Sequence, residues 1–149
     1  MSDELRELYQ TVILDHYKKP RNYGRPDGAD REAEGRNPLC GDQIKVYAKL
    51  DGERVAAVGF EGSGCAISTA SASLMTEIAR GKSRAEVEAI SARFQDLVTG
   101  KGTIDPASVG KLEVLAGVRE FPARVKCATL AWHALEAALR GSHEPVSTE

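Results

Sequence analysis

Apolar residues near the start of the chain recur at the spacing of an amphipathic helix, which this pattern predicts over residues 2–19. Acidic residues at its start and lysines at its end suit the helix dipole, and Pro20 ends it. The next segment, 21–28, is rich in glycine, proline and asparagine, so we expect a loop there. The apolar side chains on one helix face belong to Leu5, Leu8, Tyr9, Val12 and Ile13.

Alternating apolar and polar residues follow this loop, and a period of two predicts β-strands. Residues 43–50 and 54–61 both alternate, and Asp51-Gly52 between them is a strong signal for a hairpin turn. We expect a short edge strand over residues 29–36. Together these segments predict a small three-stranded antiparallel sheet.

Four further helices are expected after the sheet. Small and apolar residues indicate that the first of them is buried, and Ser83 with Glu86 matches a capping box at the start of the second. The predicted helices span residues 66–79, 83–98, 105–116 and 125–140. The expected fold class is therefore α+β, with the three-stranded sheet packed against about five helices.

The chain has 149 residues, enough for one domain with its own core, which we expect over residues 1–141. The polar residues 142–149 are expected to form a flexible C-terminal tail. A net charge of −2 gives no basic surface, so we expect no nucleic-acid partner, and no apolar run is long enough to cross a membrane. The acidic N-terminus lacks the layout of a signal peptide, so the expected location is cytoplasmic.

Three cysteines lie near predicted element boundaries and carry the candidate chemistry. Cys40 lies in a turn, Cys65 follows Gly62-Ser63-Gly64 at a predicted helix start, and Cys127 lies between basic residues near the start of the last helix. An odd number of cysteines in a reducing compartment argues against structural disulfides. With Asp42, the three thiols supply the four donors of a tetrahedral metal site. The alternative for any single cysteine is a small, buried and inert side chain.

The histidines are weaker candidates. His133 lies nearly opposite Cys127 on the same predicted helix, so the Cys–His pair that a thiol hydrolase needs is not favoured. His16 lies on the apolar face of the first helix and is expected to pack in the core or in an interface, and His143 lies in the tail.

The three cysteine motifs resemble, in this order, those of the IscU/NifU-N-terminal-like family of iron–sulfur cluster assembly proteins. They read Asn-Pro-x-Cys-Gly-Asp, Gly-x-Gly-Cys-Ala-Ile-Ser and Arg-Val-Lys-Cys-Ala-x-Leu-x-Trp. The opening helix is also similar to the start of that family. The resemblance therefore covers nearly the whole chain, from this helix to about Gly141. Within the family, the chain is similar to the SufU branch in three features. It has Lys126 in place of a histidine, an altered chaperone motif at 121–126 and a longer segment before Cys127.

This resemblance implies a zinc ion, a partner and a reaction. The partner is a pyridoxal-phosphate cysteine desulfurase of the SufS type, which hands over persulfide sulfur and works with downstream iron–sulfur assembly proteins. We expect Cys40 to be the catalytic acceptor of that sulfur, with Arg124 and Lys126 as candidate contacts to the persulfide or the partner. The implied zinc ligands are Cys40, Asp42, Cys65 and Cys127.

Two other functions use the same residues. In the first, the four side chains hold iron in a nascent [2Fe–2S] cluster, and the chain is a scaffold that passes the cluster to apo-proteins. In the second, the chain is a zinc-stabilised adaptor that activates the desulfurase without carrying sulfur.

Overall fold

Five helices and four strands make up the part of the chain that this computed structural model describes, residues 3–38, 41–101, 106–141 and 146–147. Within these ranges the side chains of residues 3–6, 8 and 106–108 are not described. The predicted number of helices and the α+β class are confirmed. The elements are α1 (Asp3–Lys18), β1 (Arg31–Asn37), β2 (Asp42–Asp51), β3 (Arg54–Ser63), α2 (Ala66–Ala79), α3 (Arg84–Thr99), the 3₁₀ helix η1 (Pro106–Glu120), α4 (Pro122–Leu139) and β4 (Val146–Ser147).

The sheet is mixed and has the strand order β3-β2-β1-β4. β2 pairs antiparallel with both β1 and β3, whereas β4 lies parallel to β1, with Val146 opposite Gly35. The prediction of a three-stranded antiparallel sheet with an edge strand over 29–36 is therefore wrong, because β1 is flanked by β2 and β4. A two-residue strand in a polar segment has no periodicity from which to predict it. It depends instead on the packing of Val146 against Ala137 and Ala138.

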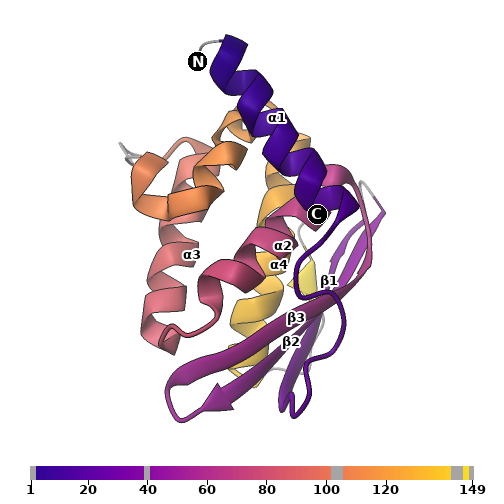
Figure 1. Cartoon of the computed structure of the whole chain (residues 1–149), viewed down its shortest axis with the longest axis vertical. Helices are drawn as coiled ribbons and strands as arrows, with labels where there is room; N and C mark the ends of the chain where they lie inside the picture. Colours follow the sequence, from indigo (N-terminus) through magenta and orange to yellow (C-terminus); the bar gives the residue numbers. More distant parts are fainter. Residues whose placement is uncertain (1–2, 39–40, 102–105, 142–145, 148–149) are drawn as a thin grey trace.

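The helices cover one face of the sheet (Figure 1). α4 lies against β1 and β2, and α2 lies against β3 and α4. α1 packs on α2, while α3 and η1 pack on each other and on α4. The core lies between the sheet and these helices, and its largest fully buried side chains belong to Trp132, Phe94, Leu74, Met75, Leu112 and Leu115.

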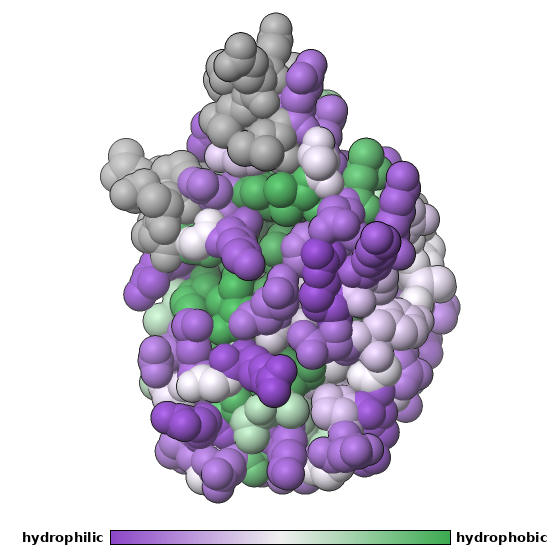
Figure 2. All heavy atoms as spheres, viewed as in Figure 1, coloured by the Kyte–Doolittle hydropathy of each residue, from purple (hydrophilic) through white to green (hydrophobic). Residues whose placement is uncertain are grey.

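Hydrophilic side chains cover most of the face shown in Figure 2, with apolar ones visible between them. None of the helices in the described ranges is both long and apolar enough to cross a bilayer.

α4 packs closely on β1 at Gly35, and this contact determines the position of the helix on the sheet. A Cβ atom on Gly35 would lie 2.9 Å from Leu130 Cδ1 and 3.2 Å from Ile44 Cγ2. The missing side chain therefore lets α4 lie near the strand. This contact brings Cys127, which lies one helical turn before Leu130, to the end of the sheet where β2 begins.

Local signals fix the starts of two helices. Ser83 caps α3 as predicted, since its Oγ accepts the Glu86 N–H at 3.1 Å and the Glu86 carboxylate accepts the Ser83 N–H at 3.3 Å. α4 begins at Pro122, earlier than predicted, because proline lacks an N–H group and is well tolerated in the first turn of a helix. Cys127 consequently lies in the second turn of α4.

The loop over residues 21–28 covers part of the sheet face opposite the helices. The Gly24 N–H donates to the Phe60 carbonyl at 2.7 Å, and the Arg25 guanidinium lies 5.9 Å from the centre of the Tyr47 ring. Tyr47 is buried beneath this loop.

His16 connects α1 to α2 and is buried, as the sequence predicted for a packed histidine. Its Nδ1 lies 2.7 Å from Ser73 Oγ, which also accepts the Arg21 N–H at 2.9 Å. On its other side Nε2 lies 3.7 Å from a Glu77 carboxylate oxygen. Burial is the main cause that lowers the pKa of His16, and the positive charge of Arg21 lowers it further. The negative charge of Glu77 acts in the opposite direction but is outweighed.

Candidate metal centre

Three of the four predicted metal ligands lie together at one end of the sheet. Asp42 begins β2, Cys65 immediately precedes α2, and Cys127 lies in α4. One ligand atom from each residue lies within 4.8 Å of the ligand atoms of the other two. The fourth predicted ligand, Cys40, lies outside the described residues. The fold thus joins side chains that are far apart in the sequence.

The Asp42 carboxylate is buried and oriented by the backbone of Cys65. Its Oδ1 accepts the Cys65 N–H at 2.8 Å, and its Oδ2 lies 3.9 Å from Cys65 Sγ. The Cys65 sulfur caps α2 by accepting the Ser68 N–H at 3.4 Å, which confirms its predicted place at a helix start. Unpaired N–H groups at a helix N-terminus stabilise negative charge on such a sulfur.

Cys127 is fully buried, and its sulfur makes polar contacts with neighbouring groups. The side-chain amide of Asn37 donates to Cys127 Sγ at 3.6 Å, and the thiol donates to the Ala123 carbonyl at 3.6 Å. In the sequence, Asn37 is part of the first cysteine motif and follows the predicted edge strand over 29–36. The structure extends β1 to Asn37, whose partner in β2 is Asp42.

A positive charge lies next to both described cysteines. The Arg124 side chain is exposed, and the attraction of Cys65 raises its pKa, with a further contribution from Cys127 and hydrogen bonds to both sulfurs. This arginine therefore stabilises negative charge on either sulfur. Lys126, the other basic residue named from the sequence, is half-buried on α4.

The turn before Cys65 is shaped by close contacts. A Cβ atom on Gly64 would lie 2.8 Å from Asp42 Oδ1, so only glycine leaves that carboxylate undisturbed. Two residues earlier, the Tyr23 hydroxyl accepts the Gly62 N–H and donates to the Gly62 carbonyl, both at 3.2 Å. These contacts hold the end of β3 and thereby the start of α2.

The donor set fits zinc. Zn²⁺ binds cysteine sulfur and carboxylate oxygen at about 2.0–2.3 Å in a tetrahedron, which places neighbouring ligand atoms roughly 3.3–3.8 Å apart. The three described donors, within 4.8 Å of one another, need only small adjustments to share one ion.

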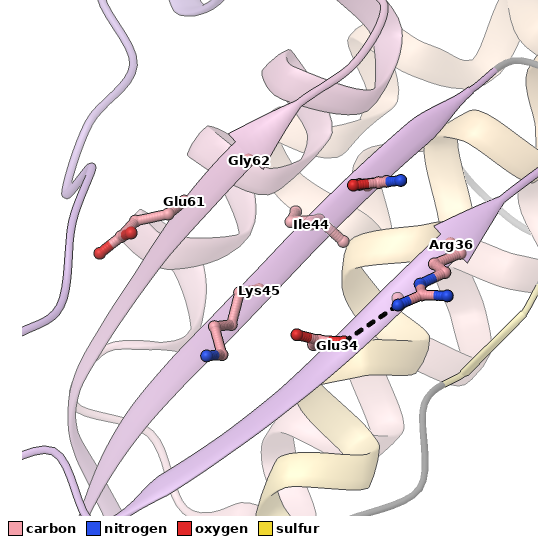
Figure 3. A pocket seen from close by; sticks show the side chains of 8 residues that line it. Glu34, Arg36, Ile44, Lys45, Glu61 and Gly62 are labelled. Carbon is pink, nitrogen blue, oxygen red and sulfur yellow. Dashed lines mark ion pairs between the residues drawn. The ribbon is translucent and has the colours of Figure 1, made fainter.

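A depression lies on the opposite face of the sheet, near the same strand ends (Figure 3). Its charged side chains are of both signs: Glu34 lies 3.6 Å from Arg36, and Lys45 stands opposite Glu61 in the register of β2 and β3. Asp42 is buried toward the helices, so this depression is separate from the metal centre.

Of the two remaining histidines, His133 lies within the described residues. His133 lies on α4 and is not part of the ligand group found among the described residues. His143 lies outside the described residues. Among the described residues, the ligand group that contains Cys127 therefore includes no histidine.

Comparison with known proteins gives consistent matches. A family profile described as NifU-like N terminal domain matches residues 8–128. The zinc-dependent sulfurtransferase SufU of Bacillus subtilis is 48% identical over 132 residues, which cover 89% of this chain and 89% of that protein. The iron–sulfur cluster assembly scaffold protein IscU of Streptococcus pyogenes serotype M1 is 42% identical over 139 residues, 93% of this chain and 87% of that protein.

A solved structure has the same fold. The SufU protein FiSufU of Fervidobacterium islandicum AW-1, described as a scaffold for the SUF system, superimposes with a TM-score of 0.83 at 35% sequence identity. The match covers 90% of this chain and 98% of that one.

Proposed function

Because this chain belongs to the family of NifU-like N-terminal domains, we propose that it is a zinc-dependent sulfur-transfer protein of iron–sulfur cluster biogenesis. It accepts persulfide sulfur from a cysteine desulfurase of the SufS type. The observation that carries this proposal is the convergence of Asp42, Cys65 and Cys127 at one end of the sheet. The name of the Bacillus subtilis relative supports both the metal and the reaction.

The proposed zinc ligands are Asp42, Cys65, Cys127 and Cys40. A zinc ion held by these residues would keep the thiols deprotonated and protect them from oxidation. Although a carboxylate is a weaker ligand than a thiolate, Asp42 Oδ1 accepts the Cys65 N–H, so this carboxylate would stay oriented toward the centre during an exchange of sulfur. The proposed acceptor is Cys40, whose position in the sequence falls between the last residue of β1 and the first residue of β2.

The transfer itself is a thiol–persulfide exchange. The Cys40 thiolate attacks the terminal sulfur of the persulfide on the desulfurase, a new S–S bond forms, and the bond to the desulfurase cysteine breaks. That cysteine leaves as a thiolate and Cys40 becomes the persulfide, so no external oxidant or reductant is needed. Arg124 is suited to stabilise the negative persulfide, because its guanidinium already interacts with two sulfurs.

Two further parts of the proposal concern the partner proteins and the cellular location. Lys126 is proposed to contact the desulfurase, and downstream iron–sulfur assembly proteins receive the sulfur. The proposed location is the cytoplasm, since reducing surroundings keep an acceptor thiol free.

The test uses the full chain with a SufS-type desulfurase and L-cysteine. After reaction, mass spectrometry of the digested protein should find one added sulfur on the Cys40 peptide, and metal analysis should find zinc in the untreated protein. Cys40→Ala should accept no sulfur and should not stimulate desulfurase turnover. Ser63→Ala, an exposed change near Cys65, is the matched control and should behave as wild type.

Two results would contradict this proposal, and each would identify a different function. Full stimulation of the desulfurase by Cys40→Ala, with no sulfur on the wild-type chain, identifies an adaptor. The second candidate is a [2Fe–2S] scaffold, which the name of the Streptococcus pyogenes relative favours. Anaerobic reconstitution with iron and sulfide, visible absorption and cluster transfer to an apo-protein would identify that function.

A further inference from the structure

We propose that Asn37 is a positioning residue of the metal centre, which orients the Cys127 sulfur through a hydrogen bond from its side-chain amide. This inference rests on the proposed function and adds to the centre a residue that is not a ligand. Asn37 ends β1 and is 0% exposed. It stands opposite Asp42 in the register, and directly opposed residues direct their side chains to the same face of a sheet.

The bond from Asn37 is compatible with a metal-bound sulfur. A Cys127 thiol donates to the Ala123 carbonyl and accepts from Asn37 Nδ2, both at 3.6 Å. Once the sulfur has lost its proton to bind a metal, it has nothing to donate to Ala123. It can still accept from Asn37, so this hydrogen bond would remain available in a metal-loaded centre.

Stability alone does not explain an amide at this position. Asn37 Oδ1 is buried and has no hydrogen-bond partner within the described part of the chain. A buried acceptor without a partner destabilises a fold, whereas an apolar side chain of similar shape would avoid that loss. The useful atom of Asn37 is therefore the donor Nδ2, and the group that receives its hydrogen bond is the Cys127 sulfur.

The charge of the centre explains why a donor is needed there. The thiolates of Cys65 and Cys127 and the Asp42 carboxylate would already carry three negative charges against the two positive charges of zinc. Hydrogen bonds to ligand atoms offset such excess charge and fix the direction of the ligand, and their loss commonly weakens metal binding about 10- to 100-fold. Arg124 supplies positive charge from the exposed side, and Asn37 supplies an N–H group from the buried side.

The test measures metal binding and spectra of the full chain, independently of sulfur transfer. Asn37→Leu removes the donor and the unpaired oxygen together, and Asn37→Ala provides a second variant in case leucine disturbs the packing. Competition with a chromophoric chelator should show a Kd for Zn²⁺ about 10- to 100-fold weaker than in wild type. The sulfur-to-metal charge-transfer band of the Co²⁺-substituted protein should move to longer wavelength, because the sulfur has lost a hydrogen bond. The metal-free Asn37→Leu protein should be at least as stable to urea as wild type.

The matched control is Ser71→Ala. Ser71 is buried and donates to the Ala128 carbonyl at 2.6 Å, so this change removes a hydrogen bond beside Cys127 without touching its sulfur. It should lower stability and leave the Co²⁺ spectrum unchanged. Wild-type affinity and spectrum in both Asn37 variants, or an equal spectral shift in Ser71→Ala, would overturn the positioning role.

The outcomes also separate this inference from the proposed function. A wild-type chain that binds Zn²⁺ but accepts no sulfur overturns the proposed sulfur transfer alone. A wild-type chain that binds neither Zn²⁺ nor Co²⁺ overturns both.

Discussion

Replacing Gly64 with alanine should weaken metal binding without unfolding the protein. The new Cβ atom would lie 2.8 Å from Asp42 Oδ1 and 3.2 Å from its Cγ, whereas ordinary contact begins at 3.4 Å. Gly64 does not have a positive φ, so alanine can adopt the backbone conformation. The carboxylate must therefore retreat, and it can do so only by disturbing its 2.8 Å bond from the Cys65 N–H.

The size of this effect follows from the bond that is disturbed. A hydrogen bond to a charged group contributes about 1.5–3 kcal/mol, and each 1.4 kcal/mol corresponds to about a tenfold change in affinity. Because Asp42 is both the displaced group and a proposed ligand, we expect the Kd for Zn²⁺ to rise about 10- to 100-fold.

Chelator competition on purified Gly64→Ala, with circular dichroism to verify the fold, measures the change. Ser63→Ala is the control, since it alters the same turn and adds no atom near the carboxylate. A Gly64→Ala protein that is folded and binds Zn²⁺ as tightly as wild type would show that the position of Asp42 does not matter to the centre.

Two predictions concern other parts of the fold. In Gly59→Ala the new Cβ would clash with the Gly24 carbonyl oxygen, so the loop over 21–28 must lift off the sheet. We expect a lower Tm and faster proteolysis in this loop, and unchanged cleavage would contradict the packing described. The pKa of His16 in the folded protein is lowered mainly by burial. The contribution of the neutral His16 side chain to stability is therefore fully present above the pKa of the unfolded state, about 6.5, and is lost as the pH falls toward the lower pKa of the folded state. Urea unfolding between about pH 7.5 and about pH 5 should show a larger loss for wild type than for His16→Gln, and equal losses would exclude this role.

Local patterns predicted much of the secondary structure. The capping box at Ser83 was confirmed because a helix start of this kind depends on atoms only three residues apart. Cys65 was placed correctly because the glycine-rich turn before it separates a strand from a helix. The start of α4 was misplaced, since Pro122 can end one segment or begin the next and the local sequence does not distinguish the two.

Features that depend on distant contacts escaped prediction. β4 pairs with β1 from the far end of the chain, and nothing in two residues of a polar segment indicates that pairing. Asn37 received no role because its importance depends on Cys127, which contacts it across 90 positions of sequence.

The sequence by itself determined which side chains carry the chemistry: three thiols and a nearby carboxylate, with motifs in an order that indicated the family. Only the tertiary structure decided that Asp42, Cys65 and Cys127 face one another, and that Arg124 and Asn37 flank their sulfurs. The reason is physical, because residue types fix what an atom can bind. The neighbours of that atom are fixed by strand pairing and by the close packing of α4 on β1. No local sequence pattern specifies either of these contacts.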